Sequence, residues 1–178
     1  MITEIKLLKI FQRIMAYLVR RINRSKWDVF DYLNEDDAPA DAMTLCLKTF
    51  NNELSTWLID DLEDLNKAIL ALITGSKQEN LSTIHIVYFD QKIIAEKALS
   101  LKNTDGDTVI GAYKKNHWDI DELTYSSLGK VKDIIIDCLR NDRFKILTKA
   151  TLKELLNNSI KNGILEKSNL NKKLQENL

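Results

Sequence analysis

Residues 82–90, STIHIVYFD, decide the fold class, because they differ from the helical patterns on either side of them. Branched and aromatic residues dominate this stretch and polar segments bound it, which is typical of a β-strand. His85 alternates with Ile84 and Ile86, so we expect it on the opposite face of the sheet, as an ordinary sheet residue rather than a catalytic base. The chain therefore contains at least one strand among its helices.

The segment that follows this strand predicts a small antiparallel meander. Residues 91–98 fit either a helix or a second strand. Residues 103–106, NTDG, form a typical hairpin turn, because Asp-Gly tolerates the positive φ angles that such turns need. Residues 108–113, TVIGAY, are then the returning strand, and 114–124 are a polar link.

Two helices are predicted in the C-terminal part, at 127–141 and 149–161, from apolar residues three and four positions apart. Ser126 or Ser127 is expected to cap the first helix, and Thr148 the second. These helices complete the core-forming part of the chain.

The length of 178 residues fits one globular domain, expected at 1–165. Residues 166–178 are polar and have few spaced apolar anchors. We expect them to form a frayed helix or a disordered tail.

Acidic residues are concentrated between positions 27 and 66, which hold eleven acids and a single lysine. Residues 40–51 fit a short helix that breaks at Asn51–Asn52. Residues 54–73 fit a long helix that stops before Gly75. The outward side of this long helix carries four acids: Asp60, Asp61, Glu63 and Asp64.

The N-terminal stretch Ile5–Lys26, IKLLKIFQRIMAYLVRRINRSK, fits one amphipathic helix with seven cations and no acid. Exposed faces of proteins normally mix the two signs of charge, so a face of one sign is unusual. Three interpretations are open. The helix packs with its cations against acids in the same fold or in a second copy, it presents a surface for nucleic acid or another polyanion, or it lies on a membrane surface.

The overall composition is that of a globular protein, with 44% hydrophobic and 29% charged residues and no net charge. Cys46 and Cys138 lie in apolar patterns without metal-ligand spacing, which indicates buried thiols in a reducing compartment. Apolar runs are too short for a membrane span, and the N-terminus is too charged for a signal peptide. We therefore expect a cytoplasmic protein.

Together these patterns predict an α+β fold that is mostly helical, with N-terminal helices, a small antiparallel meander and two C-terminal helices. The leading functional hypothesis is a non-enzymatic, nucleic-acid-associated protein that binds DNA or RNA through basic helical surfaces. Its phosphate contacts are predicted at Lys6, Lys9, Arg13, Arg20, Arg24, Lys149 and Lys153.

Two further features belong to this hypothesis. The helices at 127–141 and 149–161 are candidates for a helix-turn-helix, although their connection is longer than the usual tight turn. Tyr88, Phe89 and Tyr113 are candidates for stacking against bases, with ordinary sheet packing as the alternative.

Two other functions stay open. One is a protein-interaction module, of immunity or adaptor type, that uses the acidic residues Asp60, Asp61, Glu63 and Asp64. The other is a metal-dependent nuclease around Asp90 and Lys92, which needs further carboxylates to hold a metal. No cofactor, metal site or catalytic residue is predicted, and a homodimer is the expected assembly.

Overall fold

The computed structural model describes residues 16–27 and 37–178. It contains six strands and several helices, some of them single turns. In chain order these are β1 (Tyr17–Ile22), η1 (Arg24–Lys26), η2 (Ala42–Cys46), β2 (Leu54–Ile59), η3 (Leu62–Asp64), α2 (Leu65–Ile73), β3 (Ile84–Asp90), α3 (Lys92–Glu96), β4 (Ser100–Asn103), η4 (Gly111–Asn116), β5 (His117–Asp121), α4 (Tyr125–Arg140), β6 (Phe144–Leu147), α5 (Lys149–Lys161), η5 (Lys167–Asn169) and α6 (Lys172–Glu176).

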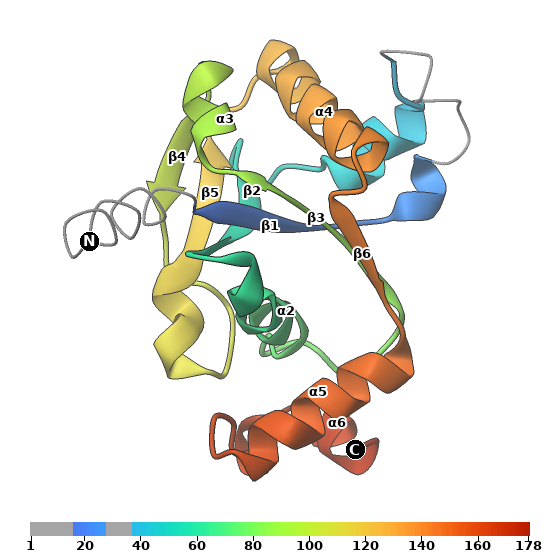
Figure 1. The fold of residues 1–178 in the computed structure, drawn as a ribbon, viewed down its shortest axis with the longest axis vertical. Helices are drawn as coiled ribbons and strands as arrows, with labels where there is room; N and C mark the ends of the chain where they lie inside the picture. The colour runs from blue at the N-terminus through green and yellow to red at the C-terminus, as the bar shows by residue number, and fades with distance from the viewer. Residues whose placement is uncertain (1–15, 28–36) are drawn as a thin grey trace, which may run out of the picture.

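The six strands form one antiparallel sheet in the order β4-β5-β2-β1-β3-β6 (Figure 1). Strand β1 is central and pairs with β2 on one side and β3 on the other. Val19 marks the register, because it lies opposite Trp57 of β2 and Tyr88 of β3. The short strands β4 and β6 form the two edges.

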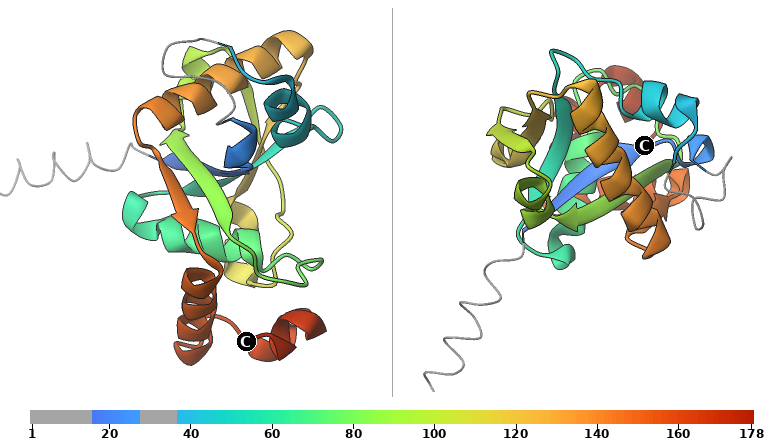
Figure 2. Two further views of the ribbon diagram at one scale, coloured as in Figure 1. Left: turned by 90° about the vertical axis from the view of Figure 1, so that its right-hand side faces the viewer. Right: turned by 90° about the horizontal axis from the view of Figure 1, so that it is seen from above.

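Helices cover both faces of the sheet, as the two views in Figure 2 show. Leu18 and Ile22 of β1 face the first core, which includes the buried side of α4. Val19, between them, faces the second core, which includes α2, α5 and α6. Alternate residues of one strand therefore enter two hydrophobic cores, as the pleat of a strand requires.

The prediction of a helix over Ile5–Lys26 is wrong where the structure describes this stretch, because Tyr17–Ile22 is strand β1. Leu18 and Ile22 are four residues apart, and this spacing shares a face in a strand as well as in a helix. Pairing with β2 and β3 on both sides gives β1 hydrogen bonds that outweigh its helical periodicity. Residues 5–15 lie outside the described part of the chain.

The prediction of a long helix over 54–73 is also wrong in its first half. Leu54–Ile59 forms β2, which contains Thr56 and Trp57, and α2 begins only at Leu65. Branched and aromatic residues favour a strand once two neighbouring strands are present to pair with it. With six strands in one sheet, the description of the fold as mostly helical with a small meander is wrong, and the fold is a mixed α+β sheet covered by helices.

The predicted hairpin at 99–113 is replaced by a wider connection. Strand β4 pairs with β5, whose residues lie in the expected polar link, and residues 111–116 form the helical turn η4. Gly106 is buried under Trp57, so residues 103–106 do not form the exposed tight turn that was predicted. Residues 91–98, which fit either a helix or a strand in the sequence, contain helix α3.

The predictions for β3, α4 and α5 are confirmed. The N-cap of α4 is Thr124, so the prediction of Ser126 or Ser127 is wrong, although Ser127 completes the capping box. Thr148 caps α5 as expected. Strand β6, between these two helices, has no counterpart in the prediction. Within the polar segment 166–178, η5 and α6 form, and Leu170 and Leu174 are buried in the second core.

Residues 16–27 and 37–178 contain no helix with the length and apolar character needed to cross a membrane.

Candidate functional site

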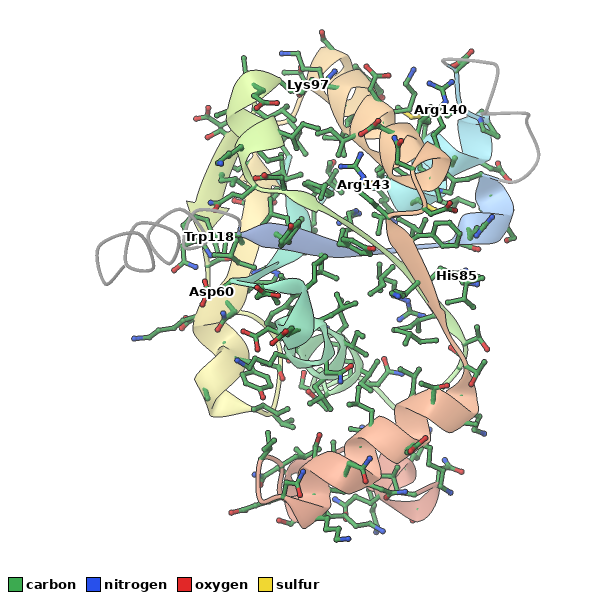
Figure 3. All side chains as sticks on the ribbon, viewed as in Figure 1. Asp60, His85, Lys97, Trp118, Arg140 and Arg143 are labelled. Carbon is green, nitrogen blue, oxygen red and sulfur yellow. The ribbon has the colours of Figure 1, made fainter. Side chains whose placement is uncertain are left out.

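A cleft of about 600 Å³ opens at the end of the sheet where β1 ends and β2 and β3 begin. Arg20 and Arg21 line it from β1, and Lys48 and Phe50 line it from the loop before β2. His85 lines it from β3. Figure 3 labels His85 on the side of the molecule where β6 lies. Three segments that are far apart in the sequence therefore contribute cations and aromatic rings to one hollow.

Arg20 is held at the cleft by main-chain oxygen atoms. Its Nη1 donates a hydrogen bond to Ser55 O and its Nη2 to Cys46 O, both at 2.7 Å. Its Nε is buried and has no partner among the described residues. Burial lowers the pKa of Arg20 to about 10, against the opposing effects of Cys46 and Asp119, so the guanidinium remains charged at neutral pH.

The other charged side chains that line the cleft leave it with a net positive charge. Arg21 and Lys48 are exposed. Among the described residues, the one acid in the lining is Glu53, whose Oε1 lies 2.8 Å from Lys102 Nζ. Within the described part of the chain, the lining therefore holds three cations and a carboxylate that is paired with a cation from β4.

Phe50 stands at the rim of the cleft, 80% exposed. Its N–H and carbonyl group exchange hydrogen bonds with Glu53 at 3.2 and 3.0 Å, which closes a tight turn. Asn51 and Asn52 occupy the centre of this turn with φ of 53° and 61°, a region that asparagine tolerates better than most residues. The turn thus carries Phe50 with its aromatic ring exposed to solvent.

Arg24 and His85 lie at the same end of the sheet. The main-chain N–H of Arg24 is 3.4 Å from Nδ1 of His85. The guanidinium carbon of Arg24 lies 4.1 Å from the ring centre of Phe144, a cation–π geometry. His85 is therefore in contact with the main chain of η1, as expected of a sheet residue.

The seven residues predicted to contact phosphate are not all brought together. Arg20 and Arg24 lie at the cleft end of the sheet, whereas Lys149 and Lys153 lie on α5, which packs on the α2 side (Figure 1). Lys153 Nζ donates to Asn177 O at 3.0 Å. Lys6, Lys9 and Arg13 lie outside the described residues.

The helix-turn-helix hypothesis is wrong, because strand β6 separates α4 from α5 and the two helices pack in different cores. The predicted stacking residues are also occupied by packing. Phe89 is buried, and Tyr88 packs edge-on against Tyr17 at 6.5 Å between ring centres. Tyr113 is partly buried against the second core.

The acidic residues of the alternative hypothesis lie between β2 and α2, at the far end of β2 from the cleft. Figure 3 labels Asp60 and His85 on opposite sides of the molecule. Asp60, Asp61 and Glu63 are exposed, and no cation of the described chain forms an ion pair with them. Asp64 pairs with Lys67 at 2.8 Å.

Asp90 and Lys92 do not form the predicted nuclease arrangement. Asp90 Oδ1 accepts a hydrogen bond from the main-chain N–H of Lys92 at 2.8 Å. Across the described residues, no group of three or more His, Cys, Asp and Glu side chains is placed to hold a metal ion.

A second polar cluster joins β5 to the loop after β4. The hydroxyl of Thr104 donates to Asp119 Oδ2 at 2.6 Å and lies 2.7 Å from His117 Nδ1. Since a hydroxyl has one hydrogen, Nδ1 must be the donor to Thr104. The hydroxyl of Thr104 therefore donates to Asp119 and accepts from His117, and the three side chains form one hydrogen-bonded network.

Three residues of the cleft were missed in the sequence: Arg21, Lys48 and Phe50. Lys48 carried a signal, because it is the single lysine among the eleven acids of residues 27–66. Phe50 precedes the pair Asn51–Asn52, which the sequence predicts as a helix break and which forms a turn.

Comparison of the chain with protein-family models, with curated proteins and with solved structures finds no match.

Proposed function

We propose that this protein is a non-enzymatic, nucleic-acid-associated protein that binds the phosphodiester backbone in the cleft at the end of the sheet where β1 ends and β2 and β3 begin. The observation that carries the proposal is that Arg20, Arg21 and Lys48 line one hollow, in which the one acid among the described residues, Glu53, is paired with Lys102. Phosphate contacts supply most of the affinity of sequence-independent nucleic-acid binding, and arginine and lysine make them.

The three cations have different parts in this proposal. Arg20 is preorganised by two main-chain carbonyls, so it loses little side-chain freedom on binding. Arg21 and Lys48 are exposed and supply mobile charges at the edge of the cleft. Lys149 and Lys153 remain predicted contacts of a separate surface on α5.

The test is a fluorescence-anisotropy titration of labelled oligonucleotides between about 50 and 200 mM salt. We expect affinity to fall steeply with salt. Arg21→Gln and Lys48→Gln should each reduce the slope of log affinity against log salt by about 0.7 to 0.9, the value for one phosphate contact. Lys149→Gln tests the predicted contribution of α5 in the same assay.

Lys97→Gln is the matched control, because Lys97 is an exposed lysine at the C-terminal end of α3 and does not line the cleft (Figure 3). Its slope should equal that of the unaltered protein. Absence of binding at low salt, or an equal loss of slope in Lys97→Gln and Lys48→Gln, would contradict the proposal.

A protein-interaction module is the second candidate, and the exposed segment with Asp60, Asp61 and Glu63 favours it. Replacing all three with lysine should abolish capture of a protein partner while nucleic-acid binding in the cleft is unchanged. Loss of both activities would show that the two surfaces are not independent.

A further inference from the structure

We infer that the cleft takes a single strand of nucleic acid, whose bases stack on Phe50 and Tyr125 while its phosphates contact the cations. This inference rests on the proposed function and names its substrate class.

A second hollow of about 430 Å³ lies between the loop before β2 and the start of α4. Lys48 lines both hollows. Met43, Leu47 and Leu128 contribute apolar side chains to the second hollow, and Tyr125 stands at its side. One cation therefore lies between a positive cleft and a hollow with apolar walls.

A main-chain hydrogen bond joins the two segments that carry the exposed aromatic residues. Asn52 O, inside the turn that carries Phe50, accepts a hydrogen bond from Leu123 N at 3.0 Å. Leu123 is followed by Thr124, the N-cap of α4, and then by Tyr125. Tyr125 is 95% exposed and Phe50 80% exposed, the two highest values among the large hydrophobic side chains of the described residues.

This arrangement favours single strands over duplexes. Bases in a duplex are stacked on each other and hide their faces, whereas a single strand offers each face to a protein ring. Alternation of cations with aromatic rings is the usual composition of single-strand binding surfaces. The turn at Asn51–Asn52 defines the backbone that carries Phe50, so a base meets a ring that is already exposed.

The experiment measures anisotropy with three labelled probes: a DNA strand of about 12 nucleotides, its duplex, and an abasic strand of equal length. The unaltered protein should bind the base-containing strand at least fivefold more tightly than either other probe, which is roughly the contribution of one stacked base. Phe50→Ala and Tyr125→Ala should each weaken binding of this strand about fivefold or more, with little effect on the abasic strand.

Tyr125→Phe keeps the ring and should retain binding. Ile164→Ala removes an exposed apolar side chain that does not line either hollow, and it should bind as the unaltered protein does. Equal affinity for the three probes, with a normal salt slope and no effect of Phe50→Ala, would overturn this inference and leave the proposed function standing. Failure to bind any probe at low salt would overturn both.

Discussion

The hydroxyl of Thr104 lies 2.7 Å from Nδ1 of His117 and donates its hydrogen to Asp119, so three polar side chains next to the second core satisfy one another. The imidazole also packs edge-on against Trp57, with 5.0 Å between ring centres. This network joins the loop after β4 to β5 and, through the ring of Trp57, to β2. Its contribution to stability depends on the protonation of His117.

Burial lowers the pKa of His117 below its ordinary value of 6.5, although Asp119 and Glu53 act in the opposite direction. The unfolded chain therefore binds a proton more readily than the folded chain does. The free energy of unfolding should be unaffected by this group above pH 6.5 and should decrease as the pH falls below it. Urea denaturation between about pH 7.5 and 5.5 measures this dependence.

His117→Gln provides the comparison for this pH dependence. The variant should be less stable at every pH, since the network with Thr104 is altered, but its stability should change less between the two ends of the range. An unchanged slope in the variant would show that another group is responsible.

Gly106 lies where a side chain has no room, because a Cβ atom there would collide with the ring of Trp57 and lie 2.8 Å from the Cβ of His117. Gly106→Ala should reduce the free energy of unfolding by about 1 to 3 kcal/mol, the usual cost of overpacking. Gly129→Ala is the control, because nothing lies within 4 Å of its Cβ position and it is inside α4. There alanine should stabilise the protein by about 0.5 to 1 kcal/mol.

Chemical or thermal denaturation of both glycine variants measures the expected loss of stability in Gly106→Ala and the expected gain in Gly129→Ala. Equal behaviour of Gly106→Ala and Gly129→Ala would contradict the packing of Gly106 under Trp57.

The sequence predicted β3, α4 and α5 because each has local signals that the rest of the fold supports. It failed at β1 and β2 because central strands are buried on both faces, and such strands lack the simple alternation of apolar and polar residues. Leu18 and Ile22 in β1, and Leu54 and Leu58 in β2, are four residues apart, a spacing that a strand and a helix both place on one face. Only the pairing of distant strands distinguishes the two structures.

The candidate site was less predictable than the fold. The clustering of N-terminal cations indicated Arg20 and Arg24, but not that Arg20 would be fixed by carbonyl groups of Ser55 and Cys46. The role of Lys48 and Phe50 depends on a turn that brings them beside β1. No local pattern in one segment contains that information.

Cys138 is fully buried in the first core, and burial raises the pKa of its thiol to about 12. Because the thiolate is the reactive form, its fraction at a given pH should be roughly a thousandfold smaller than for an ordinary cysteine. In a Cys46→Ala variant, a thiol reagent at mildly alkaline pH should label Cys138 only after urea unfolds the protein. Rapid labelling of the folded variant would contradict the burial of this side chain.

Arg20 and Arg21 are neighbours in β1 with different structural parts, which offers a direct comparison. Arg20 bridges Ser55 O and Cys46 O through two guanidinium nitrogen atoms, whereas Arg21 is exposed. A lysine has one ammonium group and does not reproduce this fork. Arg20→Lys should therefore reduce the free energy of unfolding by about 1 to 3 kcal/mol, and Arg21→Lys should change it by less than about 0.5 kcal/mol.

Urea denaturation of the two variants tests this expectation, and oligonucleotide binding measured on the folded proteins separates stability from function. If Arg20 positions the cleft as well as contacting phosphate, Arg20→Lys should weaken binding more than Arg21→Lys does, although both keep the positive charge. Equal stability and equal binding of the two variants would mean that the bridge to Ser55 and Cys46 has no part in holding the cleft.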